Sequence, residues 1–452
     1  MKVSKFMSMV LSAFVAGSMM VSTNAYADAP SGVIEITYDG ASDGPSYGLK
    51  STVDGSNVTS IVSNITSGAN YTKSVCGGLE LNTNTYDNEF YKDNTGTTLD
   101  DGVIMNMYGG YVLSLKGGNS INTGYTQQVR DYMKEGVNVG SIQINVYDGT
   151  IGKTGDSEEA IMGGGGRYCG ANTIKVNISG GTINNLVYAG TNGGTVQTTA
   201  VNISGGTINS DVYGGGRKSY GKVTEGTTVT LSGGTIVGNV YAGGNEDTVE
   251  GTTKVIITGA GSEVTGQISG GGSNGASVQG NRSLVFDEAY TGDNAYDVAE
   301  FTELDIREVA ILSALATSAN GTIVNIADDA ALTLGNVNVI DGGALEFRGG
   351  QVTITSGSIL NLGGTSITLN GTTLLSEGFT VSVDSLDEAS IFNVVDDSAL
   401  SALADVTVTL QDGTGSTKSV AASTVAKVIP EPTTATLSLL ALAGLAMRRR
   451  RM

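Results

Sequence analysis

The sequence contains no histidine and no tryptophan, and it has only 4 prolines and 2 cysteines among 452 residues. Without histidine the chain lacks the commonest general base and the commonest metal ligand, so catalysis would have to rest on carboxylates, or on Arg and Lys with a metal ion. The two cysteines, Cys76 and Cys169, allow one disulfide in an exported chain but do not make a disulfide-dependent scaffold. The sequence leaves their pairing open.

Basic residues are also scarce, with 24 Lys and Arg against 44 Asp and Glu and a formal net charge of −20. Six of the 24 basic residues lie at the two ends of the chain, at Lys2, Lys5 and Arg448 to Arg451. The body between them is therefore strongly acidic, which predicts solubility and excludes nucleic acid as a partner, because phosphate contacts need Lys and Arg clusters.

No pattern in the sequence indicates a cofactor or a set of metal ligands. Gly163 to Gly166 lacks the Gly-Lys-Ser/Thr ending of a phosphate-binding loop. The calcium-binding repeat pattern G-G-x-G-x-D has only a near miss at residues 243–247. We therefore expect neither a cofactor nor a metal.

Glycine is abundant, with 67 residues, and the rest of the body is rich in Val, Ile, Thr, Ser and Asn. Glycine disfavours long helices, Val, Ile and Thr favour strands, and Gly, Asn and Ser favour turns. The composition predicts an all-β fold.

The N-terminus has the three parts of a secretory signal peptide. Lys2 and Lys5 supply the positive charge, residues 6–21 form the apolar segment, and Ala25-Tyr26-Ala27 is an A-x-A cleavage site. We expect signal peptidase to cut before Asp28, after export by the general secretory route.

The C-terminus combines Pro430-Glu431-Pro432, a short apolar run over residues 435–447 and the cluster Arg448, Arg449, Arg450 and Arg451. The apolar run predicts a short hydrophobic helix, and the Arg cluster would stay on the cytoplasmic side of the inner membrane. An ordinary tail anchor fits the same hydropathy pattern.

This arrangement resembles the PEP-CTERM sorting signal over residues 430–452. The resemblance implies a Gram-negative bacterium that makes exopolysaccharide and an exosortase-like enzyme that processes the tail near the PEP motif. It implies transient inner-membrane anchoring, followed by release to the periplasm, the outer surface or the extracellular matrix.

The body contains an internal repeat. The unit V-N-I-S-G-G-T-I-N-N-L-V-Y starts at Val176 and recurs at Val201 and Val229, with a decayed copy at Val255 and an earlier one at Ile144. The starts of the copies from Val176 onward lie 25, 28 and 26 residues apart. A repeat with short alternating strands and glycine turns cannot bury its apolar face alone, but stacked copies bury it in parallel ladders.

The repeat therefore predicts a right-handed parallel β-helix, or β-solenoid. Three inward columns are expected, and they are Val176/Val201/Val229/Val255, Ile178/Ile203/Leu231/Ile257 and Val187/Val212/Val240/Ile268. Val75-Cys76-Gly77-Gly78 and Met107-Tyr108-Gly109-Gly110 also fit the V-Y-G-G position, which would start the array near residue 60.

A second series of apolar-polar-apolar triplets follows residue 320, from Val324-Asn325-Ile326 to Ile367-Thr368-Leu369, at intervals of 5 to 8 residues. This series predicts shorter sides of the same kind of fold. The pattern is similar to the passenger regions of autotransporters and related surface β-helix proteins.

The expected organisation has seven parts. They are a signal peptide (1–27), an N-terminal cap (28–57), a glycine-rich β-solenoid (58–280), a junction (281–319), a second β-solenoid with a cap (320–412), a flexible tether (413–429) and the sorting signal (430–452). In the junction, residues 304–306 fit a strand, and residues 309–316 fit either a helix or a strand.

Three groups of side chains are candidate sites. Tyr188, Tyr213 and Tyr241 share one repeat position and could stack on sugar rings; self-stacking is the favoured interpretation. Asn177 and Asn202 predict a structural amide ladder. Carboxylate pairs act in β-helix glycosidases and bind Ca²⁺ in lyases, but here they fit turn residues. The acidic clusters are Asp100-Asp101, Asp156/Glu158/Glu159, Asp287-Glu288, Asp328-Asp329 and Asp396-Asp397.

These observations favour a non-enzymatic protein of the envelope or matrix with a structural or adhesin-like role, which could contact exopolysaccharide. The alternative is a polysaccharide lyase or glycoside hydrolase that uses Asp and Glu pairs. The sequence assigns no catalytic residue.

Overall fold

The computed structural model describes residues 58–82, 102–118, 120–122, 138–155, 159–165, 170–340, 343–376, 378–387 and 390–429, and the backbone of four short strands before residue 58. The predicted signal peptide and its cleavage site, the PEP motif and the terminal Arg cluster lie outside these residues, apart from the backbone of strand β1 within the apolar segment.

The described chain is all-β, as its composition predicts. Its α-helix is the short α3 (Asp397–Ala402), which is followed by the 3₁₀ turns η3 (Leu403–Asp405) and η4 (Ala422–Val425). The chain divides into two compact units, residues 1–303 and 304–452.

The strands of the first unit are β1 (Val10–Leu11), β2 (Gly32–Tyr38), β3 (Ala41–Ser42), β4 (Tyr47–Lys50), β5 (Val58–Ile65), β6 (Asn70–Asn82), β7 (Gly102–Lys116), β8 (Ser120–Asn122), β9 (Asn138–Ile151), β10 (Glu159–Met162), β11 (Gly170–Ile178), β12 (Thr182–Ile183), β13 (Leu186–Tyr188), β14 (Thr195–Ile208), β15 (Val212–Tyr213), β16 (Lys222–Ile236), β17 (Val240–Tyr241), β18 (Thr248–Val249), β19 (Thr252–Ile257), β20 (Glu263–Val264), β21 (Gln267–Ser269), β22 (Ser277–Val278), β23 (Arg282–Phe286) and β24 (Ala295–Phe301). The boundary falls at β25 (Glu303–Ile306).

The strands of the second unit are β26 (Val309–Thr317), β27 (Thr322–Ile326), β28 (Ala331–Asn338), β29 (Leu345–Arg348), β30 (Gln351–Ile354), β31 (Ile359–Asn361), β32 (Ile367–Asn370), β33 (Thr373–Ser376), β34 (Phe379–Ser382), β35 (Phe392–Val394), β36 (Thr407–Gln411), β37 (Thr417–Ala421) and β38 (Ala426–Val428). β25 and β26 show that residues 304–306 and 309–316, in the predicted junction, are both strands.

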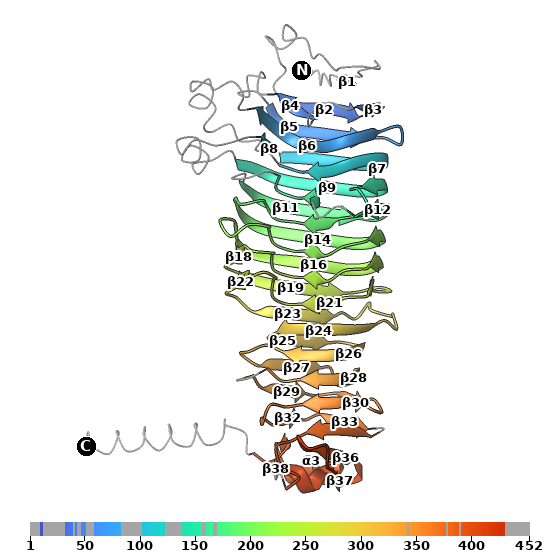
Figure 1. Ribbon diagram of the computed structural model, residues 1–452, viewed down its shortest axis with the longest axis vertical. Coiled ribbons are helices and arrows are strands. Elements are labelled where there is room, and N and C mark those ends of the chain that lie inside the picture. The colour runs from blue at the N-terminus through green and yellow to red at the C-terminus, as the bar shows by residue number, and fades with distance from the viewer. Residues whose placement is uncertain are drawn as a thin grey trace, which may run out of the picture. The chain divides into compact units, whose positions relative to one another are not determined.

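The repeat of the first unit pairs in register, copy against copy. Val176 lies opposite Val201, Val201 opposite Val229 and Val229 opposite Val255, all in parallel ladders between β11, β14, β16 and β19. These strands lie side by side in Figure 1. The predicted column is confirmed, and the other two columns pair in the same way.

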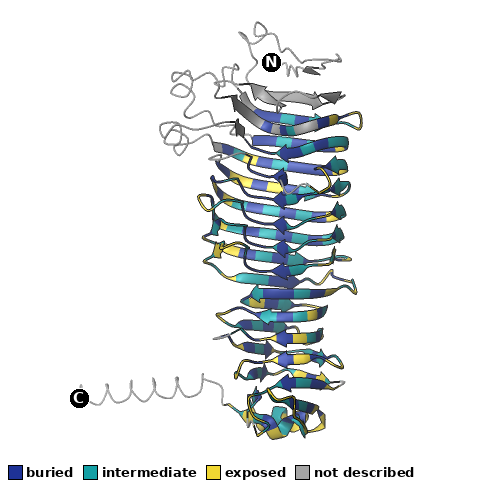
Figure 2. Cartoon of the chain, viewed as in Figure 1, coloured by how far each residue is buried: buried dark blue, intermediate teal, exposed yellow. Residues whose placement is uncertain are grey.

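The core of this unit is made of those columns. The four valines of the first column are completely buried, and in Figure 2 buried and more exposed residues alternate along the strands. Full burial of one such aliphatic side chain contributes about 1.5–3 kcal/mol, and the side chain is buried only when neighbouring copies cover it.

Glycine is required at the S-G-G turns for two reasons. Gly181, Gly206 and Gly234 have φ near +80°, a conformation that side chains disfavour. At the preceding position, a Cβ on Gly180 would lie 2.1 Å from the carbonyl oxygen of Tyr147 in the previous copy. The outer surface of these turns therefore carries no side chain beyond that of the serine.

The predicted asparagine ladder is confirmed and is longer than expected. From Asn106 onward, each amide Nδ2 donates to the Oδ1 of the asparagine in the copy before it, at distances of 2.7–3.0 Å. Thr230 follows Asn202 in the column. The ladder residues are Asn64, Asn106, Asn145, Asn177 and Asn202.

The earlier copies correct one sequence prediction. Val75 pairs with Leu115, and Leu115 with Ile161, so Val75 does occupy the V-Y-G-G position. Met107-Tyr108 does not, because Met107 pairs with Ile65 and with Val146 of the V-N-I position. Tyr108 faces outward because it follows Met107, which is buried, and successive side chains of a strand point to opposite faces.

The array also begins earlier than the predicted cap allows. The backbone of β2, within residues 28–57, pairs in parallel with β5 in the same register. This segment contains a further strand of the same ladder rather than only irregular structure.

The second unit repeats on shorter sides, as the triplets predict. Val324 pairs with Phe347, Phe347 with Leu369 and Leu369 with Val394, through β27, β29, β32 and β35. These side chains are all at most about 2% exposed and form a second core.

The end of the described chain differs from the flexible tether predicted over residues 413–429. β37 pairs antiparallel with β36, and β38 pairs in parallel with β35. Ala422 and Val425 are buried between these strands. Local composition suggested a linker, but long-range pairing and apolar burial order the segment.

Candidate functional site

The three repeat tyrosines stack on one another within the first unit. The ring centroids of Tyr188 and Tyr213 lie 4.7 Å apart, and those of Tyr213 and Tyr241 lie 4.9 Å apart, with interplanar angles of 15° and 11°. Met162 pairs with Tyr188 at one end of the stack and Ser269 with Tyr241 at the other. Both faces of Tyr213 are thus covered by rings, which leaves them closed to a sugar.

The tyrosine hydroxyls are held by neighbouring side chains. Asn245 Nδ2 donates to the Tyr188 hydroxyl at 3.1 Å, and Ser273 Oγ donates to the Tyr213 hydroxyl at 3.2 Å. The Tyr213 hydroxyl in turn donates to Asp211 at 3.3 Å. Burial raises the pKa of Tyr188 to about 12 and also raises the pKa of Tyr213, so both phenols stay protonated at physiological pH.

An ion cluster lies beside Tyr188. Glu159, whose side chain is 8% exposed, forms an ion pair with Arg217 and a longer contact of 3.8 Å with Lys116. The three residues come from parts of the chain up to 101 positions apart, between Lys116 and Arg217. Of the predicted acidic cluster, Glu159 is therefore neutralised by two cations, while Asp156 and Glu158 lie outside the described residues.

Asp247 is a buried carboxylate that the sequence did not single out, although it ends the calcium-like near miss. It is 1% exposed, and its Oδ2 accepts a hydrogen bond of 2.6 Å from the Gly216 backbone N–H. Its Oδ1 is buried without a hydrogen-bond partner. Burial raises the pKa of Asp247 to about 6.

The remaining acidic pairs serve turns rather than one common site. Asp287 accepts hydrogen bonds from Thr258 Oγ1 and from the Ala289 N–H. Asp396 caps the N-terminus of α3 by accepting from the Ala399 N–H at 2.8 Å, and the Ser398 hydroxyl and this N–H lower its pKa. Glu288, Asp328, Asp329 and Asp397 are exposed, and Asp100 and Asp101 lie outside the described residues.

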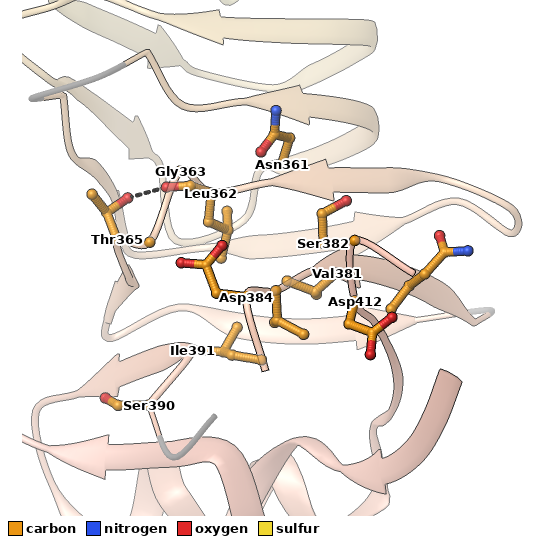
Figure 3. Close-up of a pocket in the computed structure, with 14 residues that line it drawn as sticks. Asn361, Leu362, Gly363, Thr365, Val381, Ser382, Asp384, Ser390, Ile391 and Asp412 are labelled. Carbon is orange, nitrogen blue, oxygen red and sulfur yellow. Dashed lines mark hydrogen bonds between the residues drawn. The ribbon is translucent and has the colours of Figure 1, made fainter. Parts of the chain in front are cut away.

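A polar cleft opens in the second unit (Figure 3). It encloses about 280 Å³, and its walls include the ends of β31, β34 and β36. Two carboxylates line it, Asp384 and Asp412, together with amide and hydroxyl groups. The amide and hydroxyl residues are Asn361, Gln411, Thr365, Ser382 and Ser390.

One carboxylate of the cleft, that of Asp412, accepts hydrogen bonds within a turn. Asp412 Oδ1 accepts from the Thr414 hydroxyl at 2.6 Å and from the backbone N–H of Thr414 and Ser416, and these bonds lower its pKa, the hydroxyl most. Asp384 and Asp412 lie 28 positions apart, so no paired-carboxylate pattern marked them in the sequence. The cleft can offer hydrogen bonds to a hydroxylated ligand, and none of its lining residues is cationic.

The described residues contain no group of three or more potential metal ligands from His, Cys, Asp and Glu. Within the same part of the chain, no helix has the length and apolarity needed to cross a membrane. The described residues do not include the sorting residues, which are Pro430, Glu431, Pro432 and Arg448 to Arg451.

Comparison with known proteins gives no relative: no family model, no curated protein and no solved structure matches this chain.

Proposed function

We propose that this chain is an exported surface or matrix protein whose body is a right-handed parallel β-helix with a structural or adhesin-like role. It is exported through its N-terminal signal peptide and is processed or anchored through residues 430–452 by an exosortase-like enzyme. Its chemistry is that of a scaffold, and it turns over no substrate.

The observation that carries the proposal is that the repeated residues bind equivalent residues of the neighbouring copies. Equivalent residues of successive copies pair in parallel, the asparagines form one amide ladder and the tyrosines one ring stack. A fold in which each copy supplies the partner groups of the next extends by addition of copies, which suits a spacer or a display surface. Parallel crossover connections are right-handed in general, which supports the handedness.

The position of the carboxylates also supports a scaffold. Glu159 is paired with cations, Asp287 and Asp396 serve turns and Asp247 is enclosed by backbone. A glycosidase instead needs two carboxyl groups that face one sugar across a defined gap.

Cell fractionation tests the sorting part of the proposal. An internally tagged full chain is compared with a chain lacking residues 430–452, in a host with an exosortase-like enzyme and in a matched host without it. We expect the full chain in the envelope or matrix fraction of the first host only, and the truncated chain in the soluble exported fraction of both. Equal distribution of the two chains would refute the sorting role.

Point variants sharpen this test. Replacement of Arg448 to Arg451 by Gln keeps the apolar run but removes the positive cluster, and should release the chain like the truncation does. Thr433→Ser with Thr434→Ser is the matched control, because these residues lie between the motif and the apolar run, and it should leave the distribution unchanged.

The cleft with Asp384 and Asp412 gives a specific reason to test the alternative, a carboxylate-dependent polysaccharide lyase or hydrolase. The full chain and its Asp384→Asn variant are assayed for reducing-end release on a panel of polysaccharides. Turnover by the unmodified chain that disappears in the variant would replace the scaffold proposal with an enzyme. Asp405→Asn, an exposed carboxylate away from the cleft lining, is the control.

A further inference from the structure

A second pair of tyrosines in the first unit is stacked but open to solvent. Tyr108 and Tyr147 follow the paired residues Met107 and Val146, and their ring centroids lie 5.1 Å apart at an interplanar angle of 6°. They are 52% and 48% exposed, whereas Tyr188 is completely buried. Two large parallel rings held in solvent form a rigid amphipathic surface that the core does not use.

The positions next to the pair leave room for a further ring. Thr66 follows Ile65, which pairs with Met107, and Ser179 follows Ile178, which pairs with Val146. Ser179 is exposed, and both its backbone N–H and its hydroxyl bond to the carbonyl of Val146, which holds it flat. Since strands are spaced about 4.8 Å apart, a flat ligand ring fits the next place in the stack, over Ser179.

Polar groups of the right kind flank the rings. Asn106 and Asn145 precede the two tyrosines by two positions and belong to the asparagine ladder. The half-buried amides of Asn106 and Asn177 each carry two N–H donors and give one to the ladder, which leaves one donor for a ligand. The serine hydroxyls, which donate to backbone, still accept hydrogen bonds.

The charge of this surface indicates which ligand it suits. The residues of this column next to the pair, Thr66, Ser179 and Ser204, are uncharged, as are the asparagines of the ladder beside it. The charged residue that follows Tyr147 is Asp148, which is exposed and whose carboxylate accepts from the Gly149 N–H, and the exposed Lys175 lies four positions before Ser179. On a chain with a net charge of −20, this surface repels anionic polymers and accepts neutral, hydroxyl-rich ones.

We propose that Tyr108 and Tyr147 form a binding platform for an uncharged polysaccharide that lies along the Ser-Gly-Gly turns. A pyranose ring presents an apolar C–H face, which packs on the electron-rich tyrosine face, and a rim of hydroxyls, which bonds to the Asn, Ser and Asp148 groups. This proposal rests on the surface role proposed above and adds the class of ligand. Its site is separate from the buried tyrosine stack.

Affinity electrophoresis of the purified full chain tests the platform. The probes are mixed-linkage β-glucan, galactomannan and dextran as neutral polymers, and alginate as an anionic one. We expect retardation by at least one neutral probe and none by alginate. Tyr108→Ala with Tyr147→Ala should weaken binding about tenfold or more, the effect of losing about 1.4 kcal/mol of stacking.

The control variant is Tyr220→Ala, which removes another tyrosine of this unit, 46% exposed, away from the pair. It should bind like the unmodified chain, and Tyr147→Phe should bind nearly as well because it keeps the ring. Circular dichroism verifies that each variant is folded.

Three outcomes would overturn the proposal. The first is that no neutral probe retards the chain, and the second is that the double alanine variant binds as well as the unmodified chain. The third is that the two tyrosines pair two copies of the chain instead of binding a polysaccharide. The last is detected by light scattering, as a dimer that the double variant dissociates. Because purified protein is used, these outcomes are independent of cell localisation and of the sorting test.

Discussion

Asp247 makes the folding stability of the first unit depend on pH in a direction opposite to that of most carboxylates. Its pKa rises from the ordinary value of 3.8 to about 6 because burial penalises the charged form, although the Gly216 N–H partly compensates. The folded state therefore holds the proton more tightly than the unfolded state does. The carboxyl contributes its full stability below about pH 4 and loses it as the pH rises to about 6.

The magnitude follows from the shift. Each pKa unit corresponds to about 1.36 kcal/mol, so a shift of about two units makes ionised Asp247 cost about 3 kcal/mol relative to the protonated form. This is a large fraction of the stability of an ordinary domain. Asp247→Asn removes the charge and keeps an oxygen that can accept the 2.6 Å bond from Gly216.

The assay is urea unfolding of the unmodified chain and of Asp247→Asn between pH 4 and pH 7.5, followed by circular dichroism. The other acidic residues titrate in both proteins, so the informative quantity is the difference between them. We expect the variant to gain about 3 kcal/mol relative to the unmodified chain as the pH rises through this window.

Asp396→Asn is the control with the opposite sign. The pKa of this fully exposed helix cap is lowered from 3.8 by the Ser398 hydroxyl and the Ala399 N–H, so its contribution is lost only as the pH falls below 3.8. The difference between the unmodified chain and Asp396→Asn should therefore stay constant from pH 4 to pH 7.5. If the difference between the unmodified chain and Asp247→Asn stays constant from pH 4 to pH 7.5, the burial argument is wrong. Selective ¹³C labelling of aspartate, read by NMR, gives the Asp247 midpoint directly.

Three further variants test the packing of the first unit by the same unfolding assay. Leu231→Ala opens a cavity in a completely buried column and should cost about 2–5 kcal/mol; a loss below about 1 kcal/mol would contradict the core assignment. Asn177→Ala interrupts the amide ladder between Asn145 and Asn202 and should cost about 1–3 kcal/mol, whereas a neutral effect would show that the ladder is not stabilising. Tyr213→Leu loses two ring contacts and should cost about 1–3 kcal/mol, while Tyr213→Phe keeps the stack and should cost less; equal losses would assign the effect to the hydroxyl instead.

The register of the first unit could be predicted because the copies are nearly identical in sequence. Val176, Val201 and Val229 begin the same string, and one alignment of the strings keeps every aliphatic residue inward. The mistake at Tyr108 has the same origin. M-Y-G-G matches V-Y-G-G locally, and the register is decided by the preceding Met105-Asn106, which repeats V-N.

Contacts between distant residues could not be predicted in this way. Asp247 depends on Gly216, and Glu159 on Arg217, 58 positions away, and neither pair belongs to a repeated position. The end of the second unit shows the same limit. Its Gly, Thr and Ser content suggests a linker, but Val420 pairs with Val408 and thereby orders the segment. Composition describes a segment by itself, whereas its order depends on what it pairs with.

The two tyrosine columns of the first unit differ in exposure because the segments beside them differ. In the three copies that begin at Val176, Val201 and Val229, the first valine precedes the tyrosine by 12 residues, and the tyrosines pair in register. The next copy then begins 13, 16 or 14 residues later. These variable segments supply Arg217, Asn245 and Asp247 beside the Tyr188 stack.

Loops of variable length therefore cover one column of tyrosines and close it to ligands. The Ser-Gly-Gly side has no such freedom, because Gly180 and Gly205 pack against the backbone of the preceding copy and admit no side chain. The described Ser-Gly-Gly turns that follow therefore place no bulky side chain beside the column that contains Tyr108 and Tyr147. Tyr108 and Tyr147 are exposed at one end of this row of small turn residues, and this side is where an extended polymer can follow the fold.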